Sequence, residues 1–85
     1  MMLIEFWKPN CRFCDQISPV MDSIETEFGK KLKIKKINTD ASPELAGIYN
    51  IRSVPTLILM EDGRELRRTS GAKSKAAIIE FLQLA

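Results

Sequence analysis

The sequence contains two cysteines, Cys11 and Cys14, separated by Arg12 and Phe13. As a structural disulfide they would stabilise the fold little, because disulfides stabilise mainly by closing long loops. A zinc site needs four ligands, and two thiols without any histidine would require a second chain or unusual carboxylate ligation. For a redox couple the spacing is suitable, because residues three apart on a helical turn lie about 5–6 Å apart, which a disulfide can bridge. We therefore expect a redox-active disulfide, with no metal and no bound cofactor.

The residues after the cysteines predict a helix from about Cys11 to Phe28, bent or interrupted near Pro19. Its apolar stripe is Ile17, Val20, Met21, Ile24 and Phe28, and Gly29 is the expected C-cap. Free N–H groups and the helix dipole stabilise a thiolate at the first turn, and Arg12 adds a positive charge there. We predict that Cys11 is the nucleophile and Cys14 the resolving thiol.

The remaining periodicity completes the element order βαβαββα. The expected elements are a strand over Met2–Trp7, a strand containing Leu32, Ile34 and Ile37, a helix opened by Ser42 and Pro43 and reaching about Asn50, a strand over Val54–Met60, a turn at Asp62–Gly63, a strand over Arg64–Ser70, and a helix capped by Ser74 with a buried stripe of Ala77, Ile78, Phe81 and Leu82. This order predicts an α/β fold, with a four-stranded mixed sheet covered by three helices on both faces. Such sheets bind ligands beyond the carboxyl ends of their parallel strands, where Cys11 would lie.

Composition excludes several classes of function. With 85 residues and 45% hydrophobic content, residues 1–85 are expected to form one small domain. A net charge of +2 is too small to indicate nucleic acid as a partner. No apolar run approaches a membrane span, and Glu5 interrupts the start before a signal peptide could form. We expect a cytoplasmic monomer that contacts neither nucleic acid nor membrane.

Motifs along nearly the whole chain resemble the thioredoxin family. The matching segments are Glu5-Phe6-Trp7 before the cysteine pair, Pro19 within the helix, Lys36 to Asp40, Tyr49 to Leu57, Asp62-Gly63, and Gly71 to Lys75. The resemblance implies the thioredoxin fold and reduction of protein disulfides by dithiol–disulfide exchange. The chain departs from the family in lacking an extra N-terminal strand and helix, which brings its length nearer to that of a glutaredoxin. It also carries Arg12-Phe13 between its cysteines, where thioredoxins have Gly-Pro.

The first strand would be central in this topology, so Glu5 is expected to be buried with a raised pKa. By resemblance, Glu5 would exchange a proton with Cys14 through water, with Lys36 as its partner. The alternative is that the strand tilts Glu5 into solvent and leaves Lys36 as an ordinary surface lysine.

The resemblance also implies a substrate-binding surface. Pro55 is expected to follow a cis peptide bond, and the Val54 backbone would then pair with an extended target segment beside Cys11. Trp7, Pro9, Phe13, Val54, Pro55 and Ala72 would form an apolar docking patch, with Gly71 alongside; packing in the core is the alternative for Trp7. Arg12 favours the thiolate, which predicts a reduction potential less negative than the roughly −270 mV of thioredoxin.

Three functions remain open at this point. The first is reduction of disulfide-containing target proteins, with a thioredoxin reductase as the electron donor. The second is a glutathione-coupled, glutaredoxin-like activity, because Lys8 is similar to a glutaredoxin lysine that contacts glutathione, although the glycine-pair segment by which glutaredoxins hold glutathione is missing near Gly71. The third is a non-catalytic interaction module that uses its cysteines as a redox sensor.

Overall fold

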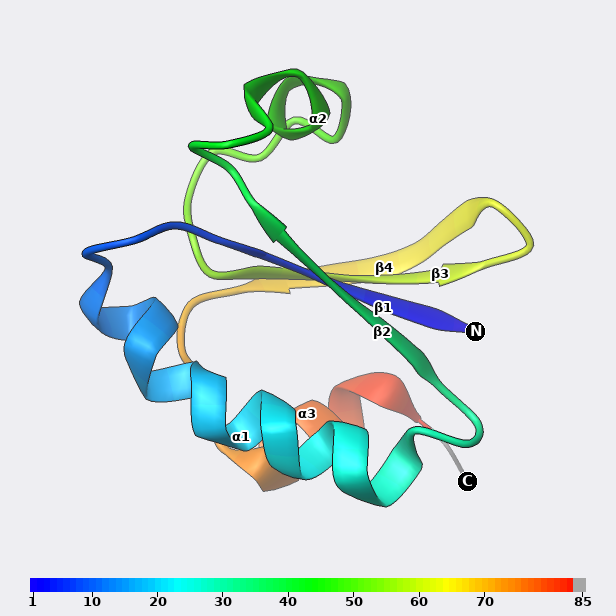
Figure 1. Cartoon of the computed structure of the whole chain (residues 1–85). Helices are drawn as coiled ribbons and strands as arrows, with labels where there is room; N and C mark the ends of the chain where they lie inside the picture. The colour runs from blue at the N-terminus through cyan, green and yellow to red at the C-terminus, as the bar shows by residue number, and fades with distance from the viewer. Residues whose placement is uncertain (84–85) are drawn as a thin grey trace.

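The computed structural model describes residues 1–83, and its elements follow the predicted order (Figure 1). They are β1 (Met2–Trp7), α1 (Arg12–Phe28), β2 (Lys33–Asn38), α2 (Pro43–Ile48), β3 (Thr56–Glu61), β4 (Arg64–Ser70) and α3 (Lys75–Leu82). The four strands form one sheet in the order β2-β1-β3-β4. β1 is parallel to β2 and antiparallel to β3, and β3 is antiparallel to β4. The predicted mixed four-stranded sheet is confirmed.

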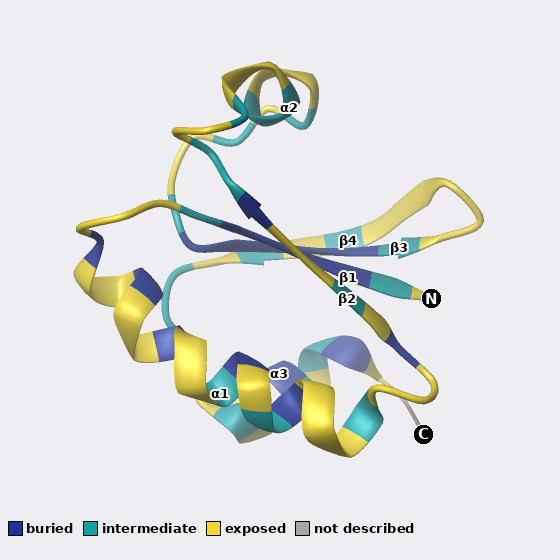
Figure 2. Ribbon diagram, viewed as in Figure 1, coloured by how far each residue is buried: buried dark blue, intermediate teal, exposed yellow. Residues whose placement is uncertain are grey.

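Helices cover both faces of the sheet, as expected (Figure 1). α1 and α3 pack on one face, over a cluster of nine fully buried residues from both helices, β1, β3 and the residue before β2, Leu32. The short helix α2 covers part of the other face, above a smaller cluster that includes Ile4, Phe6 and Ile58. Figure 2 shows the central strands β1 and β3 buried along most of their length, while the outer side of α1 is exposed. A side chain on the α1 face of β1 is therefore enclosed between sheet and helix.

Helix α1 begins one residue later than predicted, at Arg12, with Cys11 as its N-cap. It continues to Phe28 through Pro19, so of the two predicted alternatives the interruption is wrong and the bend stays a prediction. Pro19 is exposed on the solvent side of the helix, where the carbonyl group that loses its N–H partner remains hydrated. Gly29 occupies the C-cap with φ −59°, an ordinary right-handed helical value.

Several predicted boundaries and contacts differ from the structure. α2 ends at Ile48, and the Ser42 hydroxyl makes no capping hydrogen bond; the Asn38 side chain instead accepts from Asp40 and Ala41 in the turn before it. β3 begins at Thr56, after Pro55, because proline has no N–H for the ladder. The stripe of α3 is Ile78 and Leu82; Ala77 is exposed and Phe81 only partly buried.

The strand directions bring four connecting segments to one edge of the sheet. β1 and β2 end there, β3 begins there and β4 ends there. The cysteine pair, the segment before Pro55 and the turn at Gly71 consequently lie at the same edge, and the backbone of Gly71 donates to the carbonyl oxygen of Pro55 at 2.9 Å. Within residues 1–83, no helix has the length and apolar character that crossing a membrane requires.

Candidate active site

Cys11 and Cys14 form a disulfide at the first turn of α1, with a Cα–Cα distance of 5.2 Å. The backbone N–H of Cys14 donates to Cys11 Sγ at 3.2 Å, so the sulfur takes the place of an oxygen N-cap. Each further free amide of the first turn directs positive charge toward the same region. The arrangement stabilises negative charge on Cys11 in the reduced protein.

The segment before β3 lies against Cys11. The Val54 carbonyl oxygen is 3.9 Å from Cys11 Sγ, although the two residues are 43 positions apart in the sequence. The Val54–Pro55 peptide bond is cis. Val54 is half-buried, so part of it faces the solvent beside the sulfur. An extended segment of another protein that reached Cys11 would therefore meet the Val54 backbone.

Glu5 lies on the α1 face of β1, where it is 3% exposed. Its Oε1 atom has no hydrogen-bond partner within residues 1–83. Burial raises the pKa of Glu5 above its ordinary value of 4.5; the Lys36 ammonium group opposes this effect, and the Asp22 carboxylate adds to it. The expected burial is confirmed, and the solvent-facing alternative is wrong. Glu5 is thus a buried carboxyl that resists ionisation.

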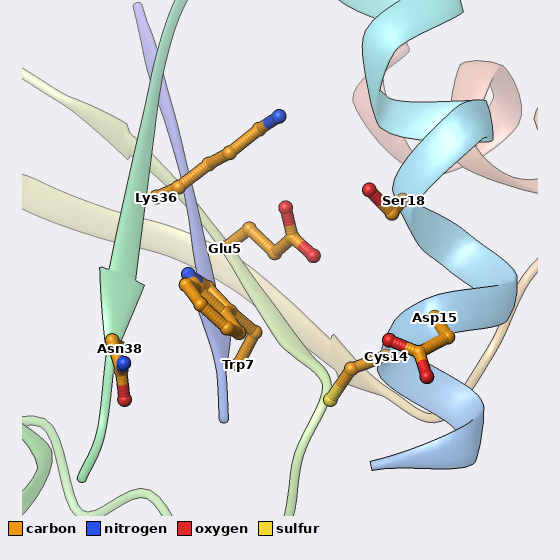
Figure 3. Close-up of a pocket in the computed structure, with 7 residues that line it drawn as sticks. All are labelled: Glu5, Trp7, Cys14, Asp15, Ser18, Lys36 and Asn38. Atoms are coloured by element: carbon orange, nitrogen blue, oxygen red, sulfur yellow. The ribbon is translucent and has the colours of Figure 1, made fainter. Parts of the chain in front are cut away.

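A cavity of about 380 Å³ joins Glu5 to the second cysteine (Figure 3). Its lining residues are Glu5, Trp7, Cys14, Asp15, Ser18, Lys36 and Asn38. Figure 3 shows the Glu5 side chain extending from β1 toward α1, with Cys14 at the start of that helix. The cavity is large enough for water, so a proton could pass between Glu5 and Cys14 along a chain of water molecules.

Lys36 makes its close ion pair with Asp22 instead of Glu5. The two residues Lys36 and Glu5 are neighbours in the β1–β2 register, but Lys36 Nζ donates to Asp22 Oδ1 at 2.9 Å. That hydrogen bond is the main reason that the pKa of Lys36 is raised. The side chains of the Lys36–Asp22 pair are 38% and 66% exposed, so both charges stay hydrated, whereas an ammonium group beside buried Glu5 would lose its water.

The predicted docking residues differ in accessibility. Phe13 is 55% exposed between the cysteines, and Pro9 is also exposed. Trp7 is half-buried and lines the Glu5 cavity, while Pro55 is fully buried. Pro55 therefore shapes the backbone beneath the surface and adds no contact area. Gly71 and Ala72 are half-buried at the same edge.

The sequence analysis missed the part played by three exposed residues of α1: Asp15 and Ser18 line the Glu5 cavity, and Asp22 pairs with Lys36. Their spacing of three and four residues was a usable signal, because it places them on one side of a helix. Arg12, beside Cys11, is exposed. In the part of the chain that the structure describes, no three potential metal ligands gather at one place.

Comparison with known proteins agrees with this geometry. The family model described as thioredoxin matches residues 1–84. The chain is 42% identical over 82 residues to the chloroplastic M-type thioredoxin of Chlamydomonas reinhardtii, covering 96% of the chain and 59% of that relative. It is 41% identical over 81 residues to the thioredoxin of Bacillus subtilis, covering 95% of the chain and 78% of that relative. The chain therefore belongs to the thioredoxin family.

Proposed function

We propose that this chain is a thiol–disulfide oxidoreductase that reduces disulfides of target proteins through Cys11 and Cys14. The observation that carries the proposal is the Cys11–Cys14 disulfide at the N-terminus of α1, with the Val54 carbonyl oxygen 3.9 Å from Cys11 Sγ. Membership of the thioredoxin family supports the same activity.

The exchange takes place in two balanced steps. In the reduced chain, the Cys11 thiolate attacks one sulfur of the target disulfide; a mixed disulfide forms, and the other target sulfur leaves as a thiolate that takes up a proton. The Cys14 thiolate then attacks Cys11 Sγ, which closes the disulfide of the structure and releases the second target thiol. Two electrons pass from the chain to the target; one of the two protons that the target thiols gain comes from Cys14 and the other from solvent.

Glu5 is the proposed proton acceptor for the second step. Its carboxylate takes the proton from the Cys14 thiol through water in the shared cavity, which makes Cys14 a competent nucleophile. The raised pKa of Glu5 lies closer to neutral pH than that of an ordinary carboxyl group, which makes the Glu5 carboxylate a stronger base. Lys36 acts on Glu5 through its charge, while its direct ion pair is with Asp22.

The proposed target-binding surface surrounds Cys11. An extended target segment pairs with the Val54 backbone as a short added strand. Exposed Phe13 and Pro9 contribute apolar contact, and the half-buried turn at Gly71 and Ala72 borders the Pro55 segment through the Gly71–Pro55 hydrogen bond. Arg12 would favour the Cys11 thiolate by its charge.

The oxidised chain has to be reduced again by an electron donor. The family favours a flavin-dependent thioredoxin reductase, and reduced glutathione is the second candidate because Lys8 resembles the glutathione-binding lysine of glutaredoxins. Comparing the turnover rates with these two donors separates the candidates. The cytoplasmic location and the monomeric state remain predictions from the sequence.

Covalent capture tests the proposed reaction. A Cys14→Ser variant lacks the resolving thiol, so it should accumulate a mixed disulfide with a target through Cys11, seen as a reducible adduct by mass spectrometry. Cys11→Ser is the matched control and should form none. A redox-sensing module without exchange activity would bind its partner equally with either variant and without an adduct, and that result would reject the proposal.

A further inference from the structure

A second cavity, of about 210 Å³, borders Val54. It is formed by the segments after β1, after β2 and before β3, which meet at one end of the sheet (Figure 1). It shares no lining residue with the Glu5 cavity. Because the Val54 carbonyl oxygen lies 3.9 Å from Cys11 Sγ, this cavity adjoins the path by which a target reaches Cys11.

Two cations and one carboxylate line this second cavity, namely Lys8, Arg52 and Asp40. Lys8 and Arg52 are exposed, and neither forms an ion pair within residues 1–83, even though Asp40 belongs to the same lining. The cation pair is therefore available to an incoming anion. Thr39 and Ser53 also line the cavity.

We propose that this cavity binds an acidic side chain of the target protein, close in sequence to the disulfide that is reduced. The proposal rests on the proposed function, because it assigns a target class to that reaction. A target segment that pairs with Val54 advances about 3.3 Å per residue, so a residue one or two positions from the target cysteine reaches the cavity. A carboxylate there accepts hydrogen bonds from the Arg52 guanidinium and the Lys8 ammonium group.

Charges at the rim of an interface act mainly on the rate of association and on the discrimination between partners. Since both cations are exposed, each contributes modestly, and together they should favour an acidic target about three- to tenfold in kcat/KM. Salt screens such ion pairs. The ratio of kcat/KM for an acidic target to that for a neutral one should therefore fall toward one as the ionic strength rises from about 10 mM to 1 M.

The test uses two peptides with the same disulfide, one with Glu and one with Gln on both sides of the reactive cysteine. The pre-reduced chain should reduce the Glu peptide about three- to tenfold faster at low salt. The double variant Lys8→Gln/Arg52→Gln should lower the Glu-to-Gln ratio to about one. Lys31→Gln/Arg64→Gln is the matched control: it removes the same two charges at exposed positions at the opposite end of the sheet and should keep the ratio.

Other outcomes overturn the proposal in distinguishable ways. A ratio of one in the unaltered chain, with both peptides reduced, rejects the acidic preference and leaves the exchange reaction intact. Equal loss of the ratio in both double variants assigns the preference to net charge and not to the cavity. Reduction of glutathione disulfide by the same variants is measured alongside. If Lys8→Gln/Arg52→Gln slows only that reaction, the cavity binds a carboxylate of glutathione and the protein-target proposal fails. If neither peptide is reduced, the proposed function itself fails, and this inference with it.

A charge-reversed variant supplies an independent measurement. Arg52→Glu should shift the preference toward a peptide with Lys in place of Glu, because the cavity would then carry two carboxylates and one ammonium group. Unchanged discrimination by this variant, with an unchanged circular dichroism spectrum, would also reject the proposal.

Discussion

The two sulfurs of the disulfide lie on the same helical turn and have different surroundings. Cys11 is the N-cap; its sulfur accepts a hydrogen bond from the Cys14 N–H and lies beside the Val54 carbonyl oxygen, and exposed Phe13 follows two residues later. Cys14 lies one turn inward and lines a cavity with the buried carboxyl of Glu5, whose Oε1 atom has no hydrogen-bond partner among the described residues. The first sulfur is surrounded by groups that can meet a partner, and the second by groups that can hold a proton.

This difference follows from the elements that supply each side. The Cys11 side is built from connecting segments at the edge of the sheet, which can vary without disturbing the core. The Cys14 side is built from the central strand β1 and the inward face of α1, which are fixed by packing. A short chain can thus combine a target surface built from loops with a proton site held by the core, and the following experiments test that separation.

The largest expected effect is on the proton side. Glu5→Gln removes the proposed base, so release of target from a preformed Cys11 mixed disulfide should slow at least about a hundredfold at neutral pH, and its rise with pH through the raised Glu5 pKa should disappear. Stopped-flow measurement of the released thiol gives the rate. Glu61→Gln, an exposed carboxylate at the far end of β3, is the control. An unaltered rate profile would separate Glu5 from the reaction.

The two thiols should also differ in reactivity, by about ten- to a hundredfold. In the reduced protein the helix N-terminus favours a thiolate at Cys11, whereas Cys14 is further inside. Alkylation by iodoacetamide at pH 7 should therefore be fast in Cys14→Ser, which keeps Cys11, and slow in Cys11→Ser. Equal rates in the two variants, or a Cys11 thiol that ionises like free cysteine, would contradict the assignment of Cys11 as nucleophile.

Stability should depend on pH through the same carboxyl. Because the pKa of Glu5 is raised in the folded state, its contribution is fully present below about pH 4.5 and is lost as the pH rises through the folded pKa. Above that window the disulfide-bonded Glu5→Gln variant should be more stable than the unaltered chain by about 1–3 kcal/mol, since it no longer buries an unpaired charge. Urea unfolding from pH 4 to 9, with Glu61→Gln as the control, measures the difference. A pH-independent difference would contradict this account of Glu5.

The Cys14 side of the site was largely predictable from the sequence, apart from the ion pair that Lys36 makes with Asp22. The element order made the apolar run Met2–Trp7 a central strand and so placed Glu5 inside, and helical spacing placed the cysteines on a first turn. The family resemblance suggested Lys36 as the partner of Glu5, and the two residues are neighbours in the β1–β2 register and share a cavity. The hydrogen-bonded ion pair of Lys36 with Asp22 was not foreseen, because it depends on where α1 places Asp22 above the sheet.

The target-binding side could be predicted less well from the sequence, because it is formed by contacts between segments that are distant in the sequence. The approach of Val54 to Cys11 joins positions 43 apart, and it was expected only through the family resemblance. The cavity beside Val54 draws Lys8, Asp40 and Arg52 from three connecting segments, and no periodicity in the sequence indicates such a meeting. The burial of Pro55 was missed for the same reason, because it depends on how the β3 start packs beneath the surface.

The smallest expected effect belongs to the apolar part of the target side. Phe13→Ala removes an aromatic side chain that is 55% exposed beside Cys11, so a protein target would lose contact area and its KM should rise about three- to fivefold with little change in kcat. The matched control is Leu66→Ala, a 44% exposed side chain on β4 away from the disulfide, which should leave KM unchanged. A fall in kcat alone would instead place Phe13 among the residues that set thiol reactivity. The Cys11 side would then act on the chemistry as well as on target binding, which contradicts the separation of the two sides.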